Sequence, residues 1–169
     1  NRITELYPIR AYASLENLNL SSWDTGNVES FRSMFINCKA LRELDLSHFI
    51  TNKNTSLTYM FFNCTNLEEI NISGFDTQNV VECDSVFSRC ENLATIQFGN
   101  FDLQKTKSLR LMFWGCNSLK ELDLHGFKTE SIEDMTALFY GCTVGHTCIF
   151  HSFHSFYSTL HQSSCLFRD

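Results

Sequence analysis

The chain has 169 residues and a formal net charge of −6, because 13 Lys and Arg stand against 19 Asp and Glu. An acidic chain of this kind has no basic surface for phosphates, which excludes nucleic acid as an expected partner. No stretch approaches the roughly 18 consecutive apolar residues of a membrane-spanning helix, so no transmembrane segment is predicted. Sixteen Phe and eight Cys accompany a single Pro, a mixture that a repeated unit would explain.

A period of 26 residues runs through most of the chain. It spaces a phrase of the form LxxLxL, two aromatic columns and five of the eight cysteines. We therefore predict five 26-residue repeats over residues 15–144. Residues 1–14 are interpreted as the eroded end of an earlier repeat. Residues 145–169 form a non-repeating tail, which we interpret as a flexible or foreign extension rather than a C-terminal cap. The repeating residues include Cys38, Cys64, Cys90, Cys116 and Cys142, with Phe35, Phe61, Phe87, Phe113 and Phe139 three positions before them.

Each repeat changes its periodicity partway. Leu44 and Leu46 flank the polar Asp45, an alternation that is typical of a strand with one buried face. Farther along the repeat, apolar residues are spaced as on one face of a helix, at Leu57, Met60, Phe61 and Cys64. A single unit cannot bury both of these faces, so the units must stack. The sequence therefore predicts an α/β solenoid, with short parallel strands on one face and short helices on the other.

The cysteines invite a zinc or disulfide interpretation, which their spacing does not favour. Zinc sites need close ligand pairs such as CxxC, and the sequence has none. In-register stacking would place successive cysteines about 4.8 Å apart, whereas disulfides bring Cβ atoms to about 3.8 Å. We predict a buried column of free thiols, with Cys83 also in the core. Cys148 and Cys165 could either pair or remain free.

Catalytic and metal-binding motifs are not recognisable in the sequence. Four histidines of the tail have irregular spacing and are not predicted to bind a metal: His146, His151, His154 and His161. There is no GxSxG, HExxH or glycine-rich phosphate loop. We expect no enzyme activity, no cofactor and no metal.

The exposed face of the predicted sheet carries the candidate binding residues. It is polar and acidic, and it contains no Lys or Arg. One interpretation is a solvated face, and the other is a binding surface for a basic or polar partner. The candidate residues are Asn17, Asn19, Glu43, Asp45, Glu69, Asn71, Gln97, Glu121 and Asp123.

The phrases LRELDLSHFITNKNTSLTYMFFNC and LEEINISGFDTQNVVECDSVFSRC resemble the 26-residue repeat of BspA-type leucine-rich-repeat surface proteins. The resemblance implies a leucine-rich-repeat solenoid on the surface of bacteria or of some protists, used for adhesion to host proteins or other cells. It therefore predicts an extracellular or cell-surface, non-catalytic module that binds a protein partner, such as a host matrix protein or a cell-surface protein. Two alternatives remain, a passive structural spacer that projects another domain and an intracellular protein-interaction scaffold.

Overall fold

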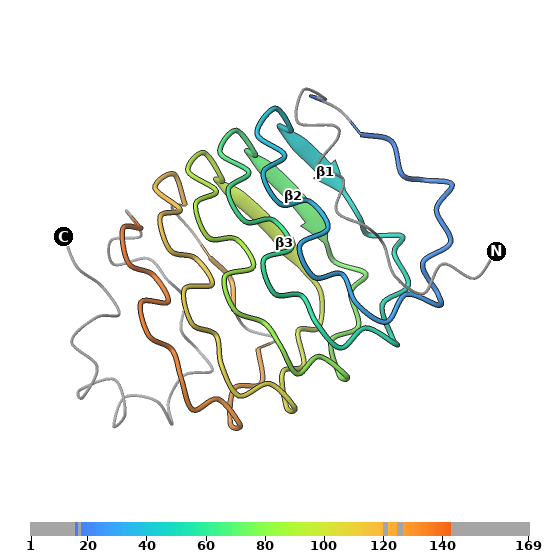
Figure 1. Ribbon diagram of the computed structural model, residues 1–169, viewed down its shortest axis with the longest axis vertical. Coiled ribbons are helices and arrows are strands. Elements are labelled where there is room, and N and C mark those ends of the chain that lie inside the picture. The colour runs from blue at the N-terminus through green and yellow to red at the C-terminus, as the bar shows by residue number, and fades with distance from the viewer. Residues whose placement is uncertain (1–15, 17, 120–121, 125–126, 143–169) are drawn as a thin grey trace.

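The computed structural model describes residues 16, 18–119, 122–124 and 127–142. The chain winds into a stack of similar 26-residue turns, which we call coils (Figure 1). One side of the stack carries a parallel sheet in the order β1 (Glu43–Asp45), β2 (Glu69–Ile72) and β3 (Thr95–Phe98). Glu43 is in register with Glu69, and Glu69 with Thr95. Equivalent positions of successive coils therefore lie side by side.

The other side of the core differs from the sequence prediction, because the described residues form no helix there. The N–H of Phe31 donates to the carbonyl oxygen of Ser56 in the next coil (3.0 Å), and that of Phe35 donates to Met60 (2.8 Å). Between these two bonds, the N–H of Met34 donates to the carbonyl oxygen of Phe31 in its own coil (3.1 Å). Hydrogen bonds between coils thus alternate with tight turns inside each coil. The predicted α/β solenoid with helices on one face is wrong.

Successive four-residue turns explain why the sequence looked helical. The first and fourth residues of each turn face the core, so two consecutive turns bury positions i, i+3, i+4 and i+7, the spacing of one helix face. The third residue of each turn takes a positive φ, 58° at Ser33 and 63° at Asn37, as a type II turn requires. The period repeats these angles at Tyr59, Ser85, Leu111 and Ala137, and at Asn63, Arg89, Gly115 and Gly141.

Threonine hydroxyls bond successive coils together at the corners between the sheet side and the turn side of the stack. Thr51 bonds to the next coil. Its hydroxyl donates to the carbonyl oxygen of Asp76 (2.9 Å) and accepts from the N–H of Asp76 (2.7 Å). Thr25 makes the same pair of bonds with Ile50, at 3.1 and 2.8 Å. The buried hydroxyls are thereby satisfied, as burial demands.

Stacked phenylalanine rings fill the core. The rings of Phe35 and Phe61 lie 5.3 Å apart with an interplanar angle of 6°. The same stacking continues through Phe87, Phe113 and Phe139, at 5.3, 5.6 and 5.4 Å. Offset-stacked rings at these separations add to the free energy gained by burial alone. The aromatic column therefore binds each coil to the next along the whole described stack.

Candidate functional site

A groove of about 520 Å³ lies over the exposed side of the sheet. It is bordered by Leu18–Ser21 of the first described coil and by residues of β1, β2 and β3. Of the predicted binding residues, Asp123 does not line this groove, and Asn17 and Glu121 lie outside the described residues. The structure brings together the other six: Asn19, Glu43, Asp45, Glu69, Asn71 and Gln97.

The groove carries negative charge. Glu43, Asp45 and Glu69 supply carboxylates, and no Lys or Arg is among its described lining residues. Ion pairs elsewhere in the described part of the chain use other acids, as Arg42 does with Glu68 at 2.8 Å. None of these described pairs includes a carboxylate of the groove. The groove is therefore suited to a cationic group brought by a partner.

Three of the groove side chains also shape the backbone beneath them. Oδ1 of Asp45 accepts the N–H of Ser47 at 2.9 Å, and this hydrogen bond holds the pKa of the Asp45 carboxyl below its usual range. Asn71 accepts from Ser73 in the same way, at 3.1 Å, and Asn19 makes the equivalent bond to Ser21. These residues thus each accept a hydrogen bond from the backbone two positions further along the chain, a role that sequence analysis did not assign to them.

His48 is a groove residue that sequence analysis missed. Its Nε2 lies 3.0 Å from the carbonyl oxygen of Leu20, and because a carbonyl can only accept, Nε2 carries the proton. The ring also meets Phe49 edge to face, at 5.1 Å. Equivalent positions in neighbouring coils hold Ser22 and Gly74, so no periodic signal marks this histidine.

None of the five repeating cysteines is in a disulfide, and all but the half-buried Cys142 are buried in the stack. The Sγ atoms of Cys64, Cys90, Cys116 and Cys142 each donate to a phenylalanine carbonyl in the preceding coil, at 2.9 to 3.1 Å. Each of these carbonyls also accepts the N–H of the cysteine in its own coil, as Phe61 does from Cys64 (3.2 Å). Each of these carbonyls therefore accepts two hydrogen bonds, one from a backbone N–H of its own coil and one from the thiol of the next coil.

Burial keeps most of these thiols protonated. Desolvation raises the pKa of Cys38 to about 12, and it raises the pKa values of Cys83, Cys90 and Cys116 well above the ordinary range. Such thiols pack as small apolar fillers in the core. Cys148, Cys165 and the four histidines of the tail lie outside the described residues.

Two further findings concern metals and membranes. In the described ranges, no group of three or more His, Cys, Asp or Glu side chains is arranged to hold a metal ion. The described residues also contain no helix long and apolar enough to cross a membrane.

One family model matches the chain, and its description is "Mycoplasma protein of unknown function, DUF285". It matches residues 4–122 and also residues 42–150, which together cover well over half of the chain. A search of curated proteins and a search of solved structures each found no match. The predicted membership of the BspA-type leucine-rich-repeat proteins is therefore wrong, since a different family matches and the helices of the predicted solenoid do not form. The chain belongs to the DUF285 family of Mycoplasma proteins of unknown function.

Proposed function

We propose that the chain is a non-catalytic binding module whose groove receives a basic segment of a protein partner. The observation that supports this proposal is the convergence of Glu43, Asp45 and Glu69 in one groove without a described Lys or Arg beside them. Asn19, Asn71 and Gln97 supply amide groups around these carboxylates. A partner with lysine or arginine side chains would complement both the charge and the hydrogen-bonding groups of this surface.

The expected interaction is electrostatic and of modest strength. Exposed ion pairs contribute about 0.2 to 1 kcal/mol each, so affinity requires several contacts made together. Salt screens exposed charges over about 10 Å at 0.1 M. Binding should therefore weaken markedly as ionic strength rises.

A charge-reversal experiment tests the groove. The probe is a synthetic peptide of alternating lysine and glycine, and its affinity for the full chain is measured by titration calorimetry at low and high salt. The variant is Glu43→Lys combined with Glu69→Lys, which spares Asp45 because that side chain closes a turn. We expect the affinity at low salt to fall at least about tenfold, since each reversal replaces attraction by repulsion.

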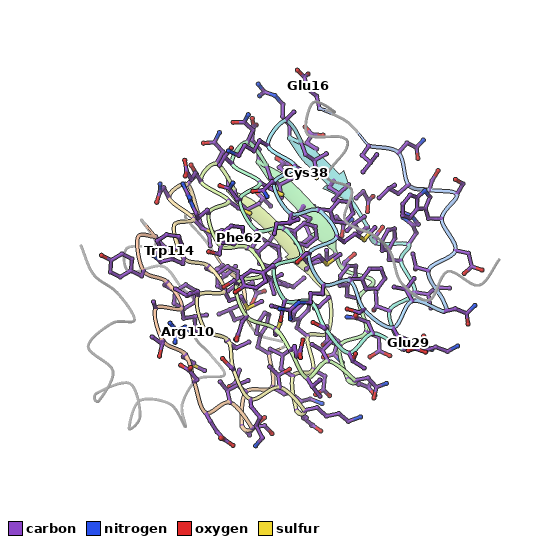
Figure 2. All side chains as sticks on the ribbon, in the orientation of Figure 1. Glu16, Glu29, Cys38, Phe62, Arg110 and Trp114 are labelled. Carbon is purple, nitrogen blue, oxygen red and sulfur yellow. The ribbon has the colours of Figure 1, made fainter. Side chains whose placement is uncertain are left out.

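A matched control separates the groove from net charge. Glu29→Lys with Glu130→Lys changes the charge of the chain equally, at two exposed positions outside the groove. Glu29 lies at the edge of the molecule away from β1 (Figure 2). The control should retain most of the affinity. An equal loss in both variants, or no binding by the original chain, would contradict the proposal and favour the passive spacer.

The cellular location is a separate proposal from the binding face. The surface location followed from the resemblance that the family match overturns, whereas an acidic binding groove is compatible with either side of a membrane. Protease treatment of intact source cells decides between them, with an antibody to the stack and a cytosolic protein as control. Cleavage of the stack with survival of the control places the module outside, and protection until lysis favours the intracellular scaffold.

A further inference from the structure

Cys116 and Cys142 are neighbours at the last described coil of the cysteine column. Three residues earlier in the same two coils, the rings of Phe113 and Phe139 stack 5.4 Å apart with an interplanar angle of 5°. The two thiols make equivalent hydrogen bonds, Cys116 to the carbonyl of Phe87 (3.1 Å) and Cys142 to that of Phe113 (2.9 Å). The two side chains therefore leave adjacent coils in the same direction, one coil spacing apart.

Exposure distinguishes Cys142 from the other cysteines of the column. Cys64, Cys90 and Cys116 have exposed fractions of 0%, whereas Cys142 is only half-buried. Cys142 is therefore the cysteine of the described column that an oxidant in solution reaches most readily. An accessible thiol beside a second thiol is the arrangement of cysteines that respond to oxidants.

We propose that Cys142 and Cys116 form a redox-responsive pair, in which a hydroperoxide oxidises Cys142 and Cys116 then closes an intramolecular disulfide. In the first step, the Cys142 sulfur attacks the peroxide, the O–O bond breaks, and a sulfenic acid forms while the thiol proton leaves with the released water or alcohol. In the second step, the Cys116 sulfur displaces the hydroxyl group. The S–S bond forms, the S–O bond breaks, and the Cys116 proton leaves with hydroxide as water. The two thiols lose two electrons and the peroxide gains them.

The geometry allows this step at the end of the column. Disulfides join residues whose Cα atoms lie about 4.4 to 6.8 Å apart, a range that contains the usual strand spacing of about 4.8 Å. In-register Cβ atoms must approach by about a further 1 Å. The half-buried Cys142 side chain has fewer neighbours to displace in that movement than the fully buried Cys64 and Cys90.

Peptide mapping tests the pair in the full chain. Cys148→Ser and Cys165→Ser are introduced first, so that the only cysteine beyond residue 128 is Cys142. The protein is treated with hydrogen peroxide, blocked with iodoacetamide under denaturing conditions and digested with trypsin without reduction. Trypsin cleaves after Arg110, Lys120 and Lys128, which places the two cysteines in different peptides. We expect a linked peptide pair that reduction separates.

Two variants identify the order of events. Cys142→Ser should abolish the peroxide-dependent loss of thiols. Cys116→Ser should leave Cys142 at the sulfenic acid, which dimedone traps. The peptide-mapping experiment keeps both Cys116 and Cys142, so its result does not depend on how well either of these two variants folds. Consumption of Cys142 with Cys116 still alkylated, linkage of Cys142 to another cysteine, or no oxidation of Cys142 would each overturn the proposal.

Discussion

Glu43 on β1 and Glu69 on β2 occupy directly opposed positions of a parallel sheet, so two carboxylates of like charge lie side by side on its exposed face. Directly opposed like charges destabilise a sheet. The next strand carries Thr95 at the same position, which ends the repulsion after two coils. A protein that keeps such a pair tolerates a small loss of stability at its groove.

Neutralising one member of this pair should stabilise the fold. Glu69→Gln is expected to raise the free energy of unfolding by about 0.2 to 0.5 kcal/mol at low salt, with a smaller gain at high salt because screening already weakens the repulsion. Urea denaturation at both salt concentrations measures the effect. The control is Glu130→Gln, an exposed residue outside the groove. An equal gain from the control would attribute the effect to net charge.

Gly74 should resist substitution because the backbone of the previous coil leaves no room for a side chain. A Cβ at Gly74 would overlap the carbonyl oxygen of Ser47, which is main chain and cannot rotate away. Gly74→Ala should therefore destabilise the protein by about 2 kcal/mol or more, as overpacking does. At Gly26 a Cβ would meet only side-chain atoms, at 3.4 Å and beyond. Gly26→Ala should be nearly neutral, and comparable melting curves for the two variants would refute the argument.

Replacing Arg89 by glycine should stabilise the turn that contains it. Arg89 has a φ of 61°, whereas Gly115 and Gly141 hold the equivalent position in the next two coils. Glycine removes the left-handed penalty of about 1 kcal/mol, partly offset by its greater freedom in the unfolded chain. The guanidinium of Arg89 lies 3.7 Å from Glu91 in an exposed pair, which contributes little. Arg89→Gly should therefore have a higher melting temperature than Arg89→Ala, since alanine keeps the strain. The reverse order of melting temperatures would contradict this reasoning.

Asp102 should make stability depend on acid pH. Its carboxylate accepts from Lys128 at 2.7 Å, and this bond lowers the pKa of Asp102. A lowered folded pKa stabilises the protein above the unfolded value of about 4, and that stabilisation is lost as the pH falls through the folded value. Lys128→Met should therefore cost stability at pH 6 and progressively less as the solution becomes more acidic.

Lys53 provides the comparison for this pH experiment. Its ammonium donates to the uncharged Oδ1 of Asn27, at 2.9 Å. Lys53→Met should change the free energy of unfolding by an amount that does not vary with pH across the titration of Asp102. Denaturation of both variants between pH 6 and pH 2 measures the two differences, and parallel pH profiles would show that Lys128 does not act through Asp102.

The sequence allowed the period and the sheet to be predicted, but not the other side of the stack. Strand residues such as Leu44 alternate with a period of two, which few other structures produce. The spacing of Phe31, Met34, Phe35 and Cys38 was ambiguous, because paired four-residue turns and a helix bury the same positions. The discriminating signal was the column that holds Asn63, Gly115 and Gly141, since Asn and Gly are the residues that most readily take positive φ.

The candidate site was predictable where it depended on alternation along a strand. Glu43, Glu69 and Gln97 line the groove because residues next to inward-facing ones must point outward. His48 was not predictable, since it follows the strand in a single coil and its place depends on a bond to Leu20. The family resemblance failed for a related reason, because repeated apolar columns record which residues are buried and not the backbone that buries them.

Hydrogen bonds join each described coil to the one that follows it in the chain. The thiols of Cys64 and Cys90 donate to the coil before them, and the N–H of Phe31 is accepted by a carbonyl of the coil after it. In both cases, hydrogen-bonding groups of the earlier coil gain their partners from the later coil. As the chain emerges from a ribosome, each new coil therefore finishes the one already made, and the least stable part of the growing stack is always its newest coil. Assembly can thus follow synthesis, without waiting for the C-terminus.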